Sequence, residues 1–256
     1  MFYALTRREE LLHLLPKGGI GAEIGVADGD FSQAILDAAA PQELHLIDPW
    51  SHLEEGSDLL AGAEVLASQA GATSEAVPEN PEGAKQYDKV VARFNAEPRV
   101  QVRRQYSYKI APQYADGFFD FVYLDGNHTY EFVLRDLIDF SAKLKPGGLM
   151  FGHDYFEDAF ARQEHYGVID AVSTFLKRSN FRFLMLTWEP FSTFCITDRL
   201  DGFAGKFLQN ALNSDLNMIE LPEVLAPNYR DKTFGRQNGT KKRIPSFTDS
   251  GAFQLR

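Results

Sequence analysis

The chain has 256 residues, of which 44% are hydrophobic, and its formal net charge is −10. That length predicts one large α/β domain, and the acidic charge argues against a nucleic-acid partner, because such proteins gain affinity from clustered Lys and Arg. No apolar stretch is long enough to cross a bilayer and the first ten residues lack the pattern of a signal peptide, so we expect a cytoplasmic protein without a membrane partner.

The first elements alternate between helix and strand. Residues 5–15 have the apolar spacing of an amphipathic helix, which Pro16 ends. Residues 21–26 form a short buried strand, residues 31–40 a helix and residues 44–48 a second strand. This β-α-β order predicts a parallel sheet with a right-handed crossover.

Residues 51–84 interrupt the alternation. They contain seven acids and no Lys or Arg, and only residues 59–67 have helical spacing. We predict a lid-like insertion here rather than a second domain.

The alternation then resumes and closes with two adjacent strands. The expected elements are the helices 85–95, 107–114, 130–144 and 168–176 and the strands 100–103, 118–125, 148–152, 181–187 and 192–197. The last two strands are joined through Trp188-Glu-Pro, and this short link predicts an antiparallel hairpin. The fold class is therefore α/β, with a Rossmann-like, seven-stranded, mostly parallel sheet, an antiparallel C-terminal hairpin and helices on both faces. The single cysteine, Cys195, lies in the final strand and is expected to be buried and inert.

These elements divide the chain into a main domain over residues 1–200 and a C-terminal extension over residues 201–256. The extension has apolar residues at helical spacing that pack either on the main domain or on a neighbouring subunit, so a homo-oligomer is left open. Its last part, residues 229–256, has seven bases and is expected to be a solvated tail.

A glycine-containing loop follows the first strand of the β-α-β unit. It reads Glu23-x-Gly25-x-x-x-Gly29, and Asp48 ends the next strand 19 residues later. Gly25 permits a tight turn, Gly29 permits close approach of a ligand, and an acid at the position of Asp48 binds ribose hydroxyls. A purely structural turn is the alternative for the loop alone, but its combination with Asp48 favours a nucleoside site.

The charge of this loop distinguishes between nucleosides. It contains Asp28 and Asp30 and no Lys or Arg, so a pyrophosphate would meet carboxylates where it needs positive potential. S-adenosylmethionine (SAM) has no phosphate and carries a sulfonium and an ammonium. The loop therefore favours SAM over NAD, and an NAD-dependent oxidoreductase ranks third among the functions considered.

The same residues resemble those of the class I SAM-dependent methyltransferases. The match runs through Glu23-Ile-Gly-Val-Ala-Asp-Gly, Asp48, residues 120–131, residues 144–148 and Gly152-His-Asp154-Tyr. These motifs are similar to those of a bacterial group of metal-dependent macrolide-sugar O-methyltransferases. This resemblance implies a cofactor pocket with Glu23, Gly25, Asp48, and also Trp50 and Gln105.

A second polar cluster follows two strands that are expected to be neighbours. It contains Asp125, Asn127, His128, His153 and Asp154. Two carboxylates on adjacent strand ends can share a hard divalent cation, although the histidines equally suit a softer metal and the acids also suit capped turns.

We hypothesise that Asp125 and Asp154 bind Mg²⁺ (or Mn²⁺), that the ion lowers the pKa of an acceptor hydroxyl, and that His128 removes the proton. By the resemblance, an Asp-x-x-His of this kind supplies a metal ligand and a base, which here are Asp125 and His128. The predicted reaction is O-methylation of a small molecule, either sugar-like or another natural product. Two alternatives remain, namely a metal-independent SAM methyltransferase acting on another nucleophile and a non-catalytic SAM-binding module.

Overall fold

The computed structural model describes residues 1–51, 80–236 and 239–247. The helices are α1 (Arg8–Leu12), α2 (Asp30–Ala39), α4 (Pro81–Phe94), α5 (Ser107–Ile110), α6 (Tyr130–Ser141), α7 (Ala159–Gln163), α8 (Val168–Arg178) and α9 (Gly202–Asn213). Two 3-10 helices are η1 (Ala111–Gln113) and η2 (Glu223–Asn228). The lid predicted over residues 51–84, with its helix 59–67, lies mostly outside the described residues.

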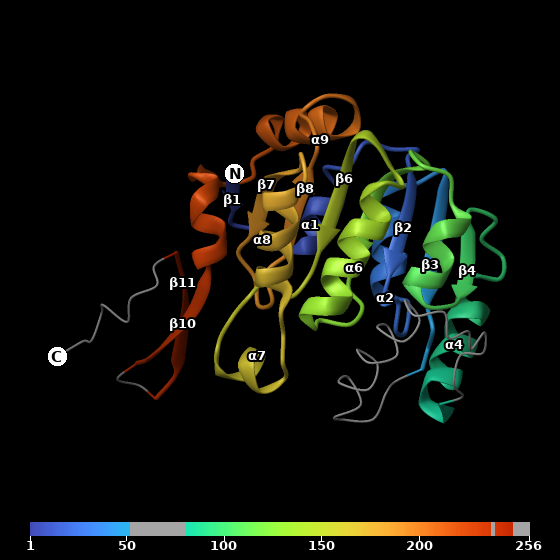
Figure 1. Ribbon diagram of the computed structural model, residues 1–256, viewed down its shortest axis with the longest axis horizontal. Coiled ribbons are helices and arrows are strands. Elements are labelled where there is room, and N and C mark those ends of the chain that lie inside the picture. Colours follow the sequence, from blue (N-terminus) through green and yellow to red (C-terminus); the bar gives the residue numbers. More distant parts are fainter. Residues whose placement is uncertain (52–79, 237–238, 248–256) are drawn as a thin grey trace.

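One mixed sheet forms the centre of the molecule (Figure 1). Its strands, in their order across the sheet, are β4 (Val100–Arg104), β3 (Glu43–Asp48), β2 (Ile20–Ile24), β5 (Phe119–Leu124), β6 (Leu144–Gly152), β8 (Phe194–Thr197), β7 (Arg182–Thr187), β1 (Phe2–Ala4) and β9 (Met218–Glu220). From β4 to β6 all neighbours are parallel, whereas β8 runs antiparallel to both β6 and β7. The mostly parallel sheet and its antiparallel C-terminal pair are thus confirmed.

The predicted number of seven strands is wrong, because the described residues already contribute nine strands to this sheet. The two additional strands lie at one edge, where β1 pairs parallel with β7 and antiparallel with β9. Each has three residues, which is too short for an alternating pattern to be visible in the sequence. Both strands are defined by partners far away along the chain and not by their own residues.

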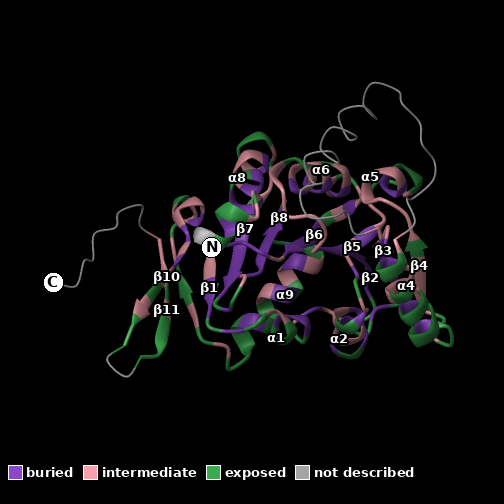
Figure 2. Cartoon of the chain, turned by 90° about the horizontal axis from the view of Figure 1, so that it is seen from below, coloured by how far each residue is buried: buried purple, intermediate pink, exposed green. Residues whose placement is uncertain are grey.

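Two apolar layers cover the two faces of the sheet (Figure 2). On one face, buried residues of the strands pack against α5, α6 and α8. On the other face they pack against α1, α2, α4 and α9. Cys195 on β8 is fully buried, and burial raises the pKa of its thiol well above the usual value. This thiol is therefore protonated and inert at neutral pH.

Residues 230–246 contain two strands within the segment that was expected to be a solvated tail. Strands β10 (Arg230–Gly235) and β11 (Lys241–Ser246) form an antiparallel hairpin that extends from the body on the side of β1 and β7 (Figure 1). The hairpin is anchored by the buried Tyr229, whose hydroxyl lies 2.7 Å from the hydroxyl of Ser192. An ion pair between Arg243 and Asp231 joins its two strands.

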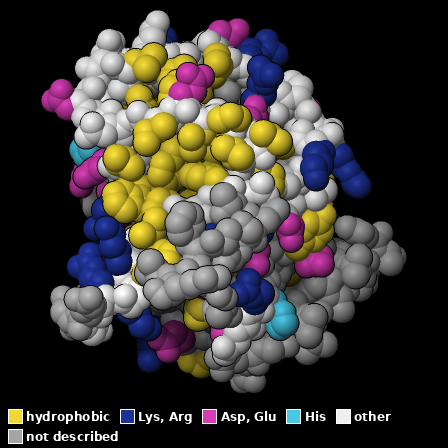
Figure 3. All heavy atoms as spheres, turned by 90° about the vertical axis from the view of Figure 1, so that its left-hand side faces the viewer, with side chains coloured by type: hydrophobic (Ala, Val, Ile, Leu, Met, Phe, Trp, Pro, Cys, Tyr) yellow, Lys and Arg dark blue, Asp and Glu magenta, His cyan; other side chains and the backbone are white. Residues whose placement is uncertain are grey.

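The edge formed by β9 and η2 carries exposed apolar side chains. Ile219 is 53% exposed and Val224 is 77% exposed. Figure 3, which views the molecule from this side, shows apolar side chains gathered on that face. None of the described helices combines the length and apolar character needed to cross a membrane.

Candidate functional site

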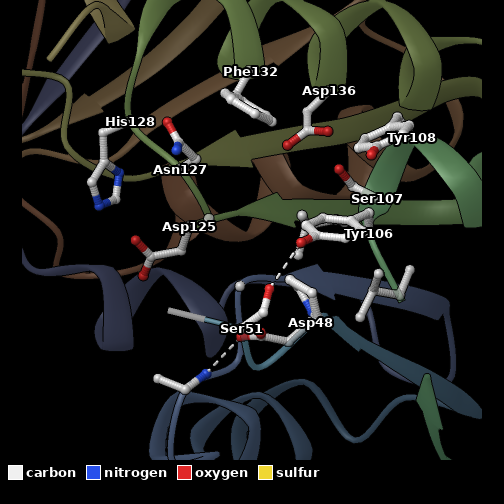
Figure 4. A pocket seen from close by; sticks show the side chains of 16 residues that line it. Asp48, Ser51, Tyr106, Ser107, Tyr108, Asp125, Asn127, His128, Phe132 and Asp136 are labelled. Atoms are coloured by element: carbon white, nitrogen blue, oxygen red, sulfur yellow. Dashed lines mark hydrogen bonds between the residues drawn. The ribbon is translucent and has the colours of Figure 1, made fainter. Parts of the chain in front are cut away.

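The carboxyl ends of β2, β3 and β5, together with residues that follow β4, enclose a cavity of about 400 Å³ (Figure 4). In an open α/β sheet ligands bind at this edge. Asp125 and His128 lie at one end of the cavity, and Tyr108, Ser107 and Asp136 lie at the other. The full lining is Ile24, Gly25, Ala27, Ile47, Asp48, Pro49, Ser51, Tyr106, Ser107, Tyr108, Asp125, Gly126, Asn127, His128, Phe132 and Asp136.

Asp48 forms part of the cavity wall at the end of β3 and shapes the loop beside it. Its Oδ2 accepts hydrogen bonds from the backbone amides of Val26 at 2.8 Å and Ala27 at 3.1 Å. Its Oδ1 accepts one from the amide of Trp50 at 2.6 Å. Oδ1 keeps a further lone pair, so this carboxylate can hold the glycine loop in place and still accept a ribose hydroxyl.

Gly25 brings two strand ends into contact. Its φ is +87°, and a Cβ at this position would lie 2.1 Å from the backbone oxygen of Asp125. Only glycine fits, because a side chain would meet both the strained backbone angle and the carbonyl. The loop after β2 therefore packs directly on the loop after β5, which places the two predicted sites side by side.

Four residues predicted to contact the cofactor lie outside the cavity wall. Gly29 begins α2 and faces Phe94 of α4. Trp50 is fully buried, and its indole nitrogen donates to the backbone oxygen of Ala27 at 2.8 Å. The side chain of Gln105 accepts a hydrogen bond from the neighbouring amide of Tyr106 at 2.9 Å. The fourth is Glu23, described next, and for all four a cofactor contact stays a prediction.

Glu23 lies beneath the loop, 1% exposed, and accepts a hydrogen bond from the hydroxyl of Ser32. Burial raises the pKa of Glu23 to about 8, although the hydrogen bond from Ser32 opposes the shift. Since its folded pKa lies above the ordinary value of 4.5, folding takes up a proton. The stabilisation is complete below pH 4.5 and is lost as pH rises through about 8.

We expect the free energy of unfolding to fall more steeply with pH in the wild type than in Glu23→Gln. The two should diverge by up to about 1.4 kcal/mol per pH unit between pH 5 and pH 8. Urea unfolding at each pH measures this difference, with the exposed Glu9→Gln as control. Parallel slopes for wild type and Glu23→Gln would mean that Glu23 ionises normally.

The acids of the glycine loop face away from the cavity. Asp28 pairs with Lys89 at 3.1 Å, and Asp30 pairs with Arg93 at 2.7 Å. Both basic residues lie on α4. The side-chain hydrogen bond from Arg93 and its charge lower the pKa of Asp30. The negative charge on the cavity wall comes instead from Asp48 and Asp125, and none of the described residues that line the cavity is Lys or Arg.

Three polar side chains from β5, β6 and the loop between β5 and α6 converge beyond the cavity. One ligand atom each of Asp125, His128 and Asp154 lies within 4.8 Å of the others, so the three could hold a metal ion. The Nδ1 of His128 is 3.2 Å from Oδ2 of Asp154, and the Nδ1 of His153 is 3.3 Å from the same oxygen. The predicted cluster is thus one compact group.

Asp154 is the buried member of this cluster. Burial alone would raise the pKa of its carboxyl, but the hydrogen bond from His153 and the charges of His128 and Arg8 outweigh it and lower the pKa. Asp154 therefore stays ionised at neutral pH. Its φ is +58°, a left-handed conformation that costs energy outside glycine and is frequent at functional sites.

Arg8 reaches the cluster from α1 and was not anticipated from the sequence. Its Nη1 lies 2.7 Å from Oδ2 of Asp125, and its guanidinium lies over the ring of Phe31, 4.4 Å from the centroid. The backbone amide of Arg8 donates to Glu189 at 3.1 Å, which fixes the start of α1 against the turn between β7 and β8. Nothing in the sequence near Arg8 signals this role, because all its partners except Glu9 and Phe31 are more than 100 residues away.

Asp136 on α6 was also missed. It lines the far end of the cavity but is only 6% exposed. Burial raises its pKa to about 7, opposed by a hydrogen bond with Ser107. One of its oxygens, Oδ1, has no hydrogen-bond partner among the described residues. A buried acid with these properties is a frequent feature of functional sites.

Comparison with known proteins identifies the family of the chain. The model of a family described as a methyltransferase domain matches residues 22–155, which is more than half of the chain and includes the residues of the cavity and the cluster. No curated protein matches the sequence. Among solved structures, the N-methyltransferase NodS from Bradyrhizobium japonicum is 14% identical to this chain. The match covers 73% of this chain and 90% of NodS, with a TM-score of 0.48. Spermidine synthase from Thermotoga maritima is 15% identical, and the match covers 80% of this chain and 60% of the synthase, with a TM-score of 0.45. On the family match, the chain belongs to the methyltransferase-domain family and is a class I SAM-dependent methyltransferase.

Proposed function

We propose that this methyltransferase transfers the methyl group of SAM to a hydroxyl oxygen of a small molecule, with assistance from a divalent cation, as in the macrolide-sugar O-methyltransferases that the sequence resembles. The observation that carries the proposal is the group of Asp125, His128 and Asp154 at the end of the nucleoside cavity. A methyl donor in the cavity would present its reactive end to this group.

The nucleoside part of SAM fits the cavity in one direction. Asp48 accepts the ribose hydroxyls from the end of β3. The adenine then points toward the aromatic end with Tyr106 and Tyr108, and the sulfonium points toward Asp125 and His128 (Figure 4). The negative charge of the cavity wall suits the positively charged sulfonium, and a phosphate would find no Lys or Arg among the described residues of that wall.

The donor atoms of the cluster fit a hard divalent cation. Asp125 and Asp154 are the metal ligands of this proposal, and carboxylate oxygens are the ligands that Mg²⁺ and Mn²⁺ prefer. Arg8 bonds Oδ2 of Asp125, whereas the nearest ionic partner of Oδ1 is Nδ1 of His153 at 3.6 Å, so Oδ1 is the oxygen that would bind the ion. A bound Mg²⁺ (or Mn²⁺) supplies positive charge that lowers the pKa of a nearby acceptor hydroxyl.

His128 is placed to act as the general base. Asp154 is ionised and lies 3.2 Å from Nδ1 of His128, so it favours the tautomer that carries its proton on Nδ1. The Nε2 lone pair is then left to accept the proton of the acceptor hydroxyl. The acceptor oxygen forms a bond to the methyl carbon while the carbon–sulfur bond breaks, and S-adenosylhomocysteine leaves with the electron pair on sulfur.

The protein's main contribution in this scheme is positioning. Holding the hydroxyl, the methyl group and the sulfur in line can contribute roughly 7–11 kcal/mol to lowering the barrier. Gly25 joins the cofactor loop to the loop of Asp125, so donor and base are held by packed backbone. This rigidity is the condition under which positioning is effective.

One alternative has a specific observation in its favour. The pair of His128 and Asp154 can remove a proton without a metal, as histidine–carboxylate pairs do in other enzymes. The protein would then be a metal-independent methyltransferase, acting on a hydroxyl or on another nucleophile such as an amine. A passive SAM-binding module is disfavoured, because binding alone requires no such cluster. We further propose a cytoplasmic location and a small-molecule partner.

The reaction is tested by the product. The protein is incubated with SAM, Mg²⁺ and a panel of sugar, polyketide, phenol and amine acceptors, and S-adenosylhomocysteine and methylated products are measured by mass spectrometry. We expect methyl transfer to hydroxyl acceptors. Methylation of amines alone would refute the hydroxyl acceptor and leave the methyltransferase assignment intact.

A further inference from the structure

Arg8 has hydrogen-bonding capacity that its neighbours do not use. Of its five N–H donors, those on Nη1 bond Asp125 and reach Tyr123 at 3.5 Å, and Nε lies 3.6 Å from Glu9. Nη2 has no hydrogen bond to any described residue. The side chain is 23% exposed, so a ligand can reach it.

The position of Arg8 is defined by three elements of the site. Its guanidinium lies against Phe31, in the first turn of α2 just after the glycine loop. It also bonds Asp125 at the end of β5, which forms the wall of the cavity. Arg8 therefore lies beside the junction of the glycine loop and the reacting cluster, where the amino-acid part of a SAM molecule would leave the sulfur.

The carboxylates around the cavity would repel the α-carboxylate of SAM unless a cation lies beside it. The cavity and cluster contribute the carboxylates of Asp48, Asp125 and Asp154, and no described residue of the cavity wall is Lys or Arg. These acids suit the sulfonium and the ammonium of SAM, but they repel its α-carboxylate. A guanidinium binds carboxylates with two parallel hydrogen bonds, which Nη2 can begin.

We propose that Arg8 binds the α-carboxylate of SAM. At the same time, its hydrogen bond to Asp125 holds the Asp125 side chain in position for the reaction. This inference rests on the proposed placement of SAM in the cavity. Arg8 thus recognises the amino-acid arm of the methyl donor, and it links donor binding to the orientation of the reacting cluster.

The test compares two ligands that differ only in the carboxylate. Isothermal titration measures the dissociation constants of S-adenosylhomocysteine and of S-adenosyl-3-thiopropylamine, which lacks that group, for the wild type, Arg8→Gln and Arg8→Lys. We expect the wild type to prefer S-adenosylhomocysteine about 10- to 100-fold, the usual value of charge-assisted hydrogen bonds. Arg8→Gln should bind both ligands almost equally, and Arg8→Lys should keep part of the preference.

Arg7→Gln is the matched control, because it removes the same charge from an exposed neighbour. Unchanged affinity of Arg8→Gln for the thiopropylamine shows that the variant is folded. An unchanged preference in Arg8→Gln, or equal losses for both ligands, would overturn the proposal; a lower turnover with an unchanged preference would show that Arg8 acts only through Asp125. If the wild type binds neither ligand, the placement of SAM itself is wrong.

Discussion

Replacing His128 with alanine is expected to lower turnover roughly 10²- to 10⁴-fold, the range for loss of a general base. The dissociation constant of S-adenosylhomocysteine should change by less than about threefold, because methyl transfer depends on this side chain whereas nucleoside binding does not. Turnover is measured as S-adenosylhomocysteine formation with the acceptor found by the product screen. The binding constant comes from titration calorimetry.

His13→Ala is the matched control for this variant. His13 is exposed at the end of α1, and its removal should leave turnover unchanged. His128→Ala with wild-type turnover would exclude His128 as the base. A variant that loses turnover and cofactor binding together would instead indicate damage to the cavity, because His128 also lines it.

The reacting cluster could be predicted because it follows directly from strand order. Asp125 and Asp154 each come after an apolar run, and parallel strands place their carboxyl ends at one edge. The structure brings β5 and β6 together as neighbours and places both acids near His128. Asp125 and Asp154 could be placed because each directly follows a strand whose apolar pattern is clear in the sequence.

Arg8, β1 and β9 could not be predicted, because what defines them lies far away in the sequence. Arg8 has its main partner at Asp125, more than 100 residues later. β1 becomes a strand through β7 and β9, which form near the other end of the chain. Local periodicity contains no information on such pairings.

Asp136 was missed for a different reason, an error in the orientation of α6. The apolar spacing of residues 130–144 favours a buried face that includes Leu134 and Ile138, yet Ile138 is 53% exposed in the structure. The buried face is Val133, Asp136, Leu137 and Phe140, which follows the i, i+3, i+4, i+7 rule with an acid at one position. That acid within an apolar stripe is the signal that would have identified Asp136.

The charge of the glycine loop shows where electrostatic reasoning from sequence is limited. Asp28 and Asp30 were expected to face the cofactor, but α4 supplies Lys89 and Arg93 as partners. The acids that do face the cavity are on other elements. The preference for a phosphate-free nucleoside is thus supported by different carboxylates from those that suggested it.

Removal of divalent cations is expected to lower methyl transfer at least 100-fold, and addition of Mg²⁺ or Mn²⁺ should restore it. The physical reason is that an acceptor alcohol is a weak acid, which a neutral imidazole deprotonates poorly without added positive charge beside the oxygen. The measurement is turnover in EDTA followed by titration with each metal. Binding of S-adenosylhomocysteine, measured in parallel, should not depend on the metal, because Asp48 and not the cluster holds the ribose.

Asp125→Asn tests the proposed metal ligand directly, and a surface variant is its control. Asp125→Asn should raise the metal concentration for half-maximal turnover at least about tenfold, since it removes one anionic ligand. Asp116→Asn is the control, because that carboxylate pairs with Lys143 at the surface. Full turnover in EDTA would eliminate the metal from the mechanism. In that case the pair of His128 and Asp154 would have to act alone, on an acceptor that reacts without metal activation, such as a phenol or an amine.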